Sequence, residues 1–254
     1  MAPRFDTVTF LSDYGTRDEF VGVVHSVIRS IAPHVTVIDL THEIPAYDVR
    51  AGSLTLGRAT QYLCPGVVLA VVDPGVGTAR RGIAVEVGGG QSYLVGPDNG
   101  VLSPALFALD AQVVQLVVPD SASPTFHGRD VFAPAAARLA TGTALDELGE
   151  RLLHPVRLRT PAPRRDANGT LHGEVLTIDR FGNAITNLMP APGSTPQAVV
   201  SGLHTLRVVR TYAEAEDSEA VALVGSSGWL ELAVRNGNAA ATLGLRRGDP
   251  VEAR

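Results

Sequence analysis

The 254-residue chain is poor in cysteine, in clustered positive charge and in long apolar runs. Cys64 is its single cysteine, so no disulfide framework is available and a reducing cytoplasm is expected. No run of about 18 apolar residues provides a membrane span. The first residues also lack the charged stretch and the apolar core of a signal peptide. The sequence therefore predicts a cytoplasmic protein with no membrane partner.

Basic patches and metal-ligand motifs are missing as well. The formal net charge is −5, whereas nucleic-acid-binding proteins usually cluster Lys and Arg on a basic background, so no nucleic-acid partner is expected. The seven histidines form no H-x-H, H-x-x-x-H or H-E-x-x-H pair. Such pairs are the usual signature of zinc ligation, so the sequence predicts no metal site.

Short β-branched runs bounded by Gly, Pro or Asp predict buried strands in the first part of the chain. Helical spacing of apolar residues separates several of these runs, at 18–32 and 47–63. A third helix is expected from Asp130 through the alanine-rich stretch 135–140, with Gly142 ending it. This alternation predicts an α/β domain over residues 1–160, with a mainly parallel sheet and flanking helices. The expected strands lie at 7–11, 35–40, 67–72, 83–87, 93–95 and 113–118.

The pattern changes after Arg159. Residues 161–170 contain Pro161, Pro163 and a pair of arginines in polar surroundings, and we expect a linker there. Beyond it, short strand-like segments separated by turn residues leave little room for helices. They predict a smaller, barrel-like all-β domain over residues 171–254. These segments lie at 173–178, 184–188, 198–200, 205–210, 221–224 and 229–234.

Polar residues follow several of the predicted strands, at the edge where ligands of open α/β sheets gather. Asp13 follows the first strand, where it either caps helix 18–32 or holds the two hydroxyls of a ribose. Asp73 ends an apolar strand and is followed by a Pro-Gly-x-Gly turn, after which Arg80 returns to pair with it. Such a pair serves either to hold the turn or to form part of a site.

Three further segments carry groups suited to chemistry. His127 lies in a Gly-containing loop, beside Arg129 and Asp130; lone histidines usually pack or face solvent, but catalysis stays open. Residues 179–183 form either a plain turn or a purine site in which Phe stacks and Asn bonds the base edge. The loops 225–229 and 236–240 are either hairpin turns or backbone-amide sites for carboxylates or base edges.

In order along the chain, these segments resemble the family of S-adenosyl-L-methionine (SAM) hydroxide adenosyltransferases, or SAM hydrolases. The family is related to fluorinating and chlorinating enzymes that use the same substrate. The resemblance covers nearly the whole chain and implies a homotrimer with active sites between neighbouring subunits. SAM is the substrate, so no cofactor is implied. The matching motifs are S-D-Y-G-T from Ser12, D-P-G-V-G-T-x-R-R from Asp73, P-D-N-G from Pro97, T-F-H-G-R-D from Thr125, D-x-F-G-N from Asp179, G-S-S-G from Gly225 and G-N-A-A from Gly237.

The same resemblance implies roles for individual residues. Asp73, Arg80 and His127 would handle the attacking water, and Asp13 would hold the ribose diol. The other implied substrate-binding residues are Tyr47, Phe126 and Gly128 around the nucleoside, Phe181 and Asn183 facing adenine, Asp18, Asp179 and Ser226 at the methionine part, Asn238 and Ala239 approaching the base through the backbone, and Glu231 as a further candidate ligand.

Several departures separate this chain from the halogenating relatives. The resemblance implies that those enzymes carry Tyr in place of Asp73 and Thr in place of Val76. It also implies Tyr in place of His127. They also carry a long insertion where this chain has only residues 87–91. Fluorinating members have Arg in place of Ser227, so how the methionine carboxylate is held stays open. The resemblance therefore favours hydrolysis over halogenation.

The predicted reaction is attack of an activated water on C5′ of SAM, giving adenosine and L-methionine. A sulfonium departs as a neutral thioether, so the leaving group needs no general acid. Asp73 or His127 would take the proton, with Arg80 as electrostatic partner. The alternatives are a metal-dependent phosphoesterase, a nucleoside hydrolase, and a module that binds adenosine or SAM without turnover.

Overall fold

A computed structural model describes residues 4–191 and 193–254. The chain divides into two compact units, Met1–Arg159 and Thr160–Arg254, which are described separately below. Among the described residues, no helix combines the length and the apolar character needed to cross a bilayer.

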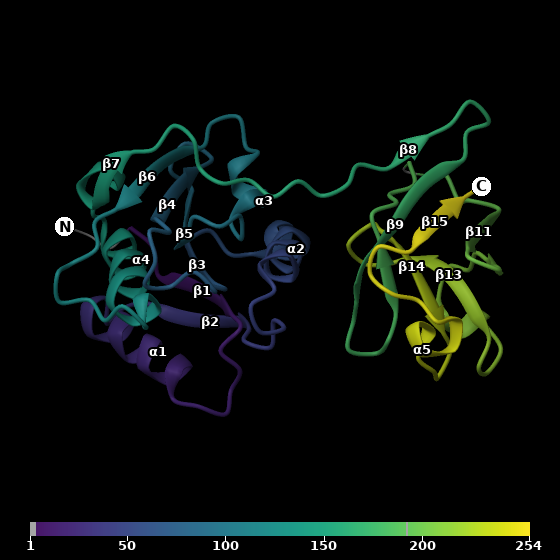
Figure 1. Cartoon of the computed structure of the whole chain (residues 1–254), viewed down its shortest axis with the longest axis horizontal. Helices are drawn as coiled ribbons and strands as arrows, with labels where there is room; N and C mark the ends of the chain where they lie inside the picture. The colour runs from purple at the N-terminus through teal and green to yellow at the C-terminus, as the bar shows by residue number, and fades with distance from the viewer. Residues whose placement is uncertain (1–3, 192) are drawn as a thin grey trace. The chain divides into compact units, whose positions relative to one another are not determined.

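The first unit is built on one mixed sheet with the strand order β2-β1-β3-β5-β4-β6-β7 (Figure 1). Strands β2, β1, β3 and β5 pair in parallel, whereas β4, β6 and β7 join by antiparallel pairing. The predicted α/β class is confirmed, and the antiparallel part begins at the β4–β5 hairpin. The strands are β1 Thr7–Ser12, β2 Thr36–Thr41, β3 Val67–Val71, β4 Gly82–Val87, β5 Ser92–Pro97, β6 Gln112–Leu116 and β7 Gly149–Arg151.

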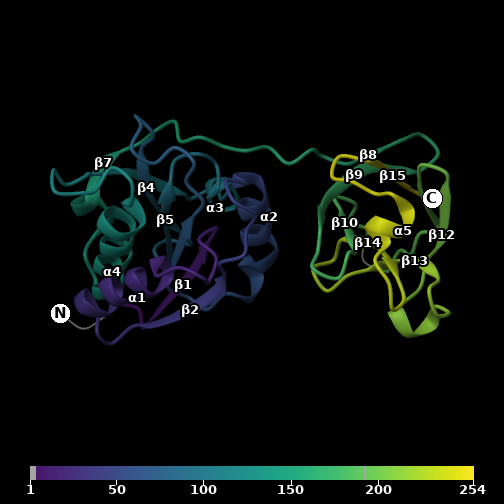
Figure 2. The same ribbon diagram turned by 60° about the horizontal axis from the view of Figure 1, so that its bottom comes forward.

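Helices cover both faces of this sheet (Figures 1 and 2). Successive strand residues point to opposite faces, so a continuous apolar strand such as β3 feeds two cores. Val67, Leu69 and Val71 pack in the core that contains α1 and α4. Val68 and Ala70 pack in the core that contains α2 and α3. The helices are α1 Phe20–Ile31, α2 Val49–Ala59, α3 Ser103–Leu106 and α4 Ala133–Thr141, with short helical turns η1 Thr60–Tyr62, η2 Gly128–Phe132 and η3 Leu145–Leu148.

One strand departs from its predicted environment. The run 35–40 was expected to be a buried strand, but β2 lies at the edge of the sheet and its side chains are largely exposed. A β-branched run has the same appearance at an edge as in the centre of a sheet, so this prediction is wrong for a reason the local sequence does not contain. The predicted end of α4 is confirmed, because Gly142 adopts the left-handed conformation at its C-terminus.

The second unit is an antiparallel sheet with the order β12-β11-β15-β9-β10-β14-β13, and β8 pairs with β9. A bridge between Val208 and Ala222 connects the two ends of this order, so the sheet nearly closes and the predicted barrel-like all-β class is confirmed. Its strands are β8 Arg164–Arg165, β9 Leu171–Ile178, β10 Ala184–Thr186, β11 Ala198–Ser201, β12 His204–Arg207, β13 Ala220–Val224, β14 Leu230–Val234 and β15 Pro250–Ala253.

Several elements of this unit were not predicted. Helix α5, Ala239–Leu243, begins at Asn238, whose Oδ1 accepts a hydrogen bond from Ala241 N at 2.8 Å. Strand β15 lies between β11 and β9 although its sequence is short and begins with proline. A further short helical turn, η4, spans Tyr212–Glu214. Within the predicted linker 161–170, β8 already belongs to the sheet.

Candidate active site

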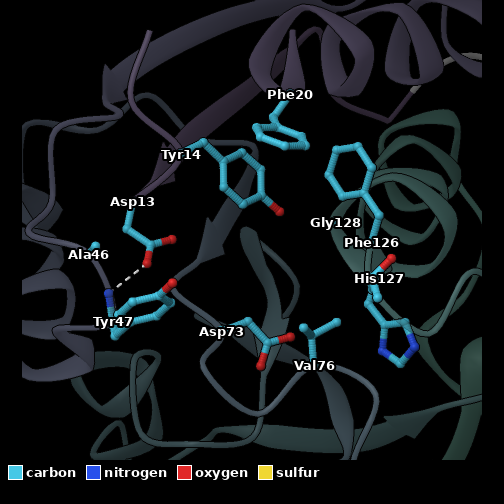
Figure 3. A pocket seen from close by; sticks show the side chains of 11 residues that line it. Asp13, Tyr14, Phe20, Ala46, Tyr47, Asp73, Val76, Phe126, His127 and Gly128 are labelled. Carbon is cyan, nitrogen blue, oxygen red and sulfur yellow. Dashed lines mark hydrogen bonds between the residues drawn. The ribbon is translucent and has the colours of Figure 1, made fainter. Parts of the chain in front are cut away.

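A cavity of about 320 Å³ opens in the first unit beyond the carboxyl ends of β1 and β3 (Figure 3). This is the edge at which the sequence placed its polar clusters. Six predicted site residues line the cavity: Asp13, Tyr47, Asp73, Phe126, His127 and Gly128. The others in its lining are Tyr14, Phe20, Ala46, Val76 and Thr125.

The structure brings Asp73, Arg80 and His127 together. Arg80 Nε donates to Asp73 Oδ1 at 2.9 Å, and Arg80 Nη2 donates to Asp73 Oδ2. The same Nη2 lies 3.2 Å from His127 Nδ1. The side chains of Arg80 and Asp73 are only 8% and 6% exposed. Asp73 and His127 line the cavity, while Arg80 lies behind them and bridges the two.

A close approach of two loops makes this cluster possible. Gly77 has a φ of +77°, and a Cβ at this position would lie 2.4 Å from the carbonyl oxygen of Pro124. Glycine therefore allows the loop that follows Asp73 to pack on the loop that carries His127. The amide of Asn99 donates to Val72 O at 2.8 Å and holds the end of the strand immediately before Asp73.

The loop that carries His127 leads into the π-helical turn η2. Such turns are rare and frequently occur at functional sites. Asp130 accepts two hydrogen bonds from Arg129 and one from Ser123 N, so its carboxylate fixes the loop. Gly128 lies against Tyr14, where a Cβ would come within 2.0 Å of the tyrosine Oη. A side chain at residue 128 would therefore displace the tyrosine hydroxyl.

Asp13 joins the first and second strand–helix connections. Its Oδ2 accepts a hydrogen bond from Tyr47 N at 2.9 Å (Figure 3). Helix α1 begins after Glu19, so the alternative that Asp13 caps this helix is wrong. Burial raises the pKa of Asp13 above its ordinary value, opposed by the Tyr47 N–H. Tyr47 itself is 74% exposed and has a positive φ of 68°, which is uncommon for a tyrosine.

The electrostatics of Asp73 and His127 follow from burial. Burial raises the pKa of Asp73 above its ordinary value, and the Arg80 guanidinium opposes this shift. Burial lowers the pKa of His127, and Arg80 lowers it further. Arginine has no acceptor, so the 3.2 Å contact requires His127 Nδ1 to accept. The proton of the neutral imidazole is thereby assigned to Nε2.

An aromatic cluster forms one wall of the cavity, and sequence analysis assigned only Phe126 of this cluster to the site. The rings of Phe20 and Phe126 lie 5.2 Å apart, and Tyr14 contacts both rings. The hydroxyl of Tyr14 points into the cavity (Figure 3). Tyr14 could have been found because it directly follows Asp13. Phe20 reads as a core position of α1, and no local signal distinguishes it.

The second unit has its own cavity, of about 1030 Å³, beside β10, β13 and β14. The predicted residues that line it are Asp179, Phe181, Asn183, Ser226, Glu231 and Asn238. Besides Arg80, two predicted residues lie outside both linings. Asp18 is exposed in the turn before α1, and Ala239 is completely buried at the start of α5.

The segment D-R-F-G-N forms a tight turn between β9 and β10. The carboxylate of Asp179 accepts hydrogen bonds from Phe181 N, Asn183 N and Asn183 Nδ2, at 2.9, 2.9 and 3.1 Å. The turn therefore has a structural reason for its Asp and Asn. It also presents the Phe181 ring, 74% exposed, at the cavity. The segment therefore fits both alternatives from the sequence analysis, a plain turn and a site for a purine.

Glu231 is a buried carboxylate in this second cavity. Tyr212 donates its hydroxyl hydrogen bond to Glu231 Oε2 at 3.1 Å. Burial, together with the nearby Glu231, raises the pKa of Tyr212 to about 12. The side chain of Asn238 caps α5, which was not predicted, since the sequence assigned it a backbone contact with the base.

Comparison with known proteins places the chain. It matches the SAM hydroxide adenosyltransferase N-terminal domain over residues 8–149 and the C-terminal domain of the same family over residues 173–252. The chain belongs to the SAM hydroxide adenosyltransferase family. A relative from Thermus thermophilus named (R)-S-adenosyl-L-methionine hydrolase is 44% identical, covering 96% of this chain and 98% of that protein. A relative from Salinispora tropica with the same name is 42% identical, covering 98% of this chain and 97% of that protein.

The chain is also similar to a solved structure and, at lower identity, to a halogenating enzyme. An uncharacterized conserved protein from Thermotoga maritima is 35% identical with a TM-score of 0.88, covering 97% of this chain and 100% of that chain. A protein from Actinoplanes sp. named fluorinase is 30% identical, covering 89% of this chain and 90% of that protein. Val76 lines the first cavity beside Asp73. Its apolar side chain supplies no hydroxyl there.

Proposed function

We propose that this chain hydrolyses S-adenosyl-L-methionine to adenosine and L-methionine, by attack of water at C5′ of the ribose. The observation that carries the proposal is the cluster of Asp73, Arg80 and His127 at the wall of the first cavity. Membership of the SAM hydroxide adenosyltransferase family supports it, as do relatives at 42–44% identity named (R)-S-adenosyl-L-methionine hydrolase.

The first cavity offers groups suited to a nucleoside. Asp13 has a carboxylate that can accept both hydroxyls of a ribose, and its Tyr47 N–H contact fixes its orientation. Tyr47 and Phe126 supply aromatic surfaces within the same lining. The ribose would thereby bring its C5′ toward Asp73 and His127.

Asp73 is the proton acceptor in this proposal. His127 Nδ1 already accepts from Arg80, so its Nε2–H is a donor that orients the water and cannot take a proton. Asp73 uses its oxygens with Arg80, but each carboxylate oxygen has a second lone pair. As the water oxygen bonds to C5′, the C5′–S bond breaks with its electron pair going to sulfur. The water proton passes to Asp73 and then to solvent.

Charge neutralisation favours this reaction in a buried site. A partly formed hydroxide and a sulfonium have opposite charges that cancel as the bond forms. A site that excludes bulk water therefore stabilises the transition state relative to the separated charges. Proton transfer to a positioned base supplies about 10²–10⁴ in rate, and alignment of the water with the C–S bond adds to this.

The second cavity is assigned to the remaining parts of the substrate. Phe181 would stack on adenine and Asn183 would bond its edge. The methionine part would lie near Asp179 and Ser226, with Asp18 from the first unit, and Glu231, Asn238 and Ala239 complete the proposed set. The proposed enzyme is a cytoplasmic homotrimer that needs no cofactor or metal for turnover, with active sites at subunit interfaces.

The relatives' names specify one epimer at sulfur. A sulfonium with three different carbon substituents is pyramidal and stereogenic, so a shaped cavity discriminates between its two forms. We extend the (R) preference to this chain. Incubation with the separated epimers, followed by chromatography, should show faster consumption of the (R) form.

The product analysis in labelled water tests the reaction itself. The chain is incubated with SAM in H₂¹⁸O, the products are separated by chromatography, and their masses are measured by mass spectrometry. We expect adenosine with the label on its 5′ oxygen and unlabelled methionine, with turnover unchanged by a chelator. Free adenine would indicate a nucleoside hydrolase, and turnover that a chelator abolishes would indicate a metal enzyme. Binding without products would indicate a sensing module. Each of these results would overturn the proposal.

The variant Asp73→Asn tests the assigned base. It keeps the size of the side chain and removes the proton-accepting carboxylate, so kcat should fall by about 10²–10⁴. Adenosine binding, measured by calorimetry, should stay within a few fold because Asp13 and the aromatic wall are untouched. Circular dichroism establishes that the variant is folded. Turnover near the level of the unmodified chain would show that Asp73 is not the base.

A further inference from the structure

We propose that His25, Asp39 and His42 form a binding site for a divalent transition metal ion, for which zinc is the first probe. One ligand atom from each residue lies within 4.8 Å of the other two. His25 comes from α1, Asp39 lies in β2, and His42 follows β2. Neither the family comparison nor the proposed reaction involves this trio, so the inference stands independently of the proposed function.

The distances suit coordination. Both His25 Nε2 and His42 Nε2 lie beside the same oxygen, Asp39 Oδ1, at 2.8 and 2.9 Å. Nitrogen and oxygen ligands of zinc lie about 2.0–2.2 Å from the ion, which separates them by about 3.3 Å in a tetrahedral site. Side-chain movements of a few tenths of an ångström would therefore admit an ion. Two imidazoles and one carboxylate also form the protein ligand set of known zinc and iron sites with open positions.

The orientation of His42 distinguishes this trio from a plain hydrogen-bond network. His42 is nearly completely buried, with only 4% of its side chain exposed. Its Nε2 has no hydrogen-bond partner among the described residues, although Asp39 Oδ1 is 2.9 Å away, because the contact does not have hydrogen-bond alignment. A buried ring nitrogen without a partner is destabilising. A metal ion near His25 and Asp39 would satisfy it.

The surroundings of His42 match those of a metal-bound imidazole. Its other nitrogen, Nδ1, lies 2.8 Å from Ser12 Oγ in a buried contact. Metal-ligating histidines usually donate this second N–H to a neighbouring polar group, which fixes the ring. The Phe10 ring packs 4.6 Å from the His42 ring, centroid to centroid, and further restricts its orientation. Coordination through Nε2 with the proton on Nδ1 therefore needs no rotation of this side chain.

The other two ligands give an ion access to the trio. The side chains of His25 and Asp39 are 33% and 42% exposed. An ion can therefore enter from solvent, and water can fill its remaining coordination positions. No sequence motif indicates this site, because the two histidines are separated in the chain and only the packing of α1 beside β2 brings them together.

Zinc titration of the untagged, chelator-treated full chain tests the proposal by calorimetry. We expect one tight zinc ion per chain, and at least about tenfold weaker binding in His25→Ala and in Asp39→Asn, because even second-sphere changes weaken metal sites to this extent. The matched control is His172→Ala. His172 Nε2 lies 2.8 Å from Asp166 Oδ2 and its Nδ1 lies 3.5 Å from Glu252 Oε1, but among the described residues these side chains do not form a group that could hold a metal ion. Equal affinity in the unmodified chain and His25→Ala would overturn the proposal.

Thermal unfolding separates metal binding from a purely structural role. Zinc should raise the Tm of the unmodified chain and of His172→Ala, but not that of His25→Ala. A trio that only joins α1 to β2 would instead give His25→Ala the same loss of Tm with zinc and with chelator. Cobalt provides a direct signature, since Co²⁺ bound by nitrogen and oxygen ligands absorbs visible light. This absorption should disappear in His25→Ala.

Discussion

Arg80 donates to both Asp73 and His127, and its third nitrogen, Nη1, is buried without a hydrogen-bond partner among the described residues. A buried donor without a partner is destabilising on its own. In the proposed reaction the positive charge of this guanidinium lies directly behind the carboxylate and the imidazole that face the water. One guanidinium thus orients the base, fixes the imidazole tautomer and adds positive charge where negative charge develops.

The pKa shifts of these residues predict the pH dependence of turnover. The active form has Asp73 ionised and His127 neutral, so both protonations lower the rate as pH falls. Burial raises the pKa of Asp73 above its ordinary 3.8 and lowers the pKa of His127 below its ordinary 6.5. We therefore expect kcat/KM to fall at acid pH, with the Asp73 step above its ordinary value and the His127 step below its ordinary value.

The variant His127→Asn is the control for this profile. It removes the imidazole titration, so the remaining acid limb should reflect Asp73 alone, at a lower overall rate. Measurement of kcat/KM in buffers from acid to neutral pH checks both curves. A rate that rises as the pH falls below 6.5 would contradict the assigned protonation states.

The Tyr14 hydroxyl gives a second prediction at this scale. In Tyr14→Phe the ring still packs on Phe20 and Phe126, so stability should be nearly unchanged. The hydroxyl that points into the cavity is lost, and kcat/KM should fall about tenfold, the effect of one hydrogen bond. Tyr93→Phe is the matched control, because that hydroxyl donates to Glu86 at 2.7 Å outside the cavity. Equal activities of the two variants would argue against a role for Tyr14.

At the scale of elements, Gly77 is a position of the site where a larger side chain should be poorly tolerated. Gly77→Ala adds left-handed strain of about 1–2 kcal/mol. It also forces a displacement from Pro124 O that adds about 1–3 kcal/mol. The loops that carry Arg80 and His127 should separate, so kcat should fall with stability. Urea unfolding and steady-state kinetics measure the two effects.

Gly89→Ala is the control for backbone strain alone. Gly89 has a φ of +60°, but nothing lies within 4 Å of a Cβ placed on it. This variant should lose about 1–2 kcal/mol of stability and keep its activity. If both variants behaved alike, loop contact would not be what positions Arg80.

Local patterns predicted most elements because the strands of the first unit are apolar runs between strong turn residues. The return of Arg80 to Asp73 also followed from the turn between them. Structural features that depend on tertiary packing could not be predicted from these local patterns. The edge position of β2, the central position of the short β15, and the meeting of His25 with His42 all depend on which segments pack together. Phe20 belongs to the cavity only because α1 begins beside it.

At the scale of the whole molecule, the predicted site residues are divided between two cavities, one in each compact unit. The proposed homotrimer would combine a first cavity with the second cavity of a neighbouring subunit. We expect Asp73→Asn to inactivate the first cavity and Phe181→Ala to weaken the second, and Phe181 is exposed, so its truncation disturbs no buried residue. These two variants therefore test whether subunits share a site.

The two variants are co-expressed with different tags, and mixed oligomers are purified through both. If sites are shared between neighbouring subunits, every mixed trimer has both cavities intact at one of its three sites, and activity should recover to about one third. Assays use SAM well below KM, where Phe181→Ala alone is weak. No recovery in mixed oligomers, or a monomeric mass in light scattering, would contradict the trimer with shared sites.

Ser12 and Asp13 are neighbours at the end of β1, the first in contact with His42 and the second in the cavity wall. Metal binding at His42 and nucleoside binding at Asp13 would therefore both act on the same short stretch of backbone. If zinc at the trio changes nucleoside affinity by some factor, thermodynamic linkage requires the nucleoside to change zinc affinity by the same factor. A single pair of titrations, each repeated with the other ligand saturating, would measure that reciprocity from both ends.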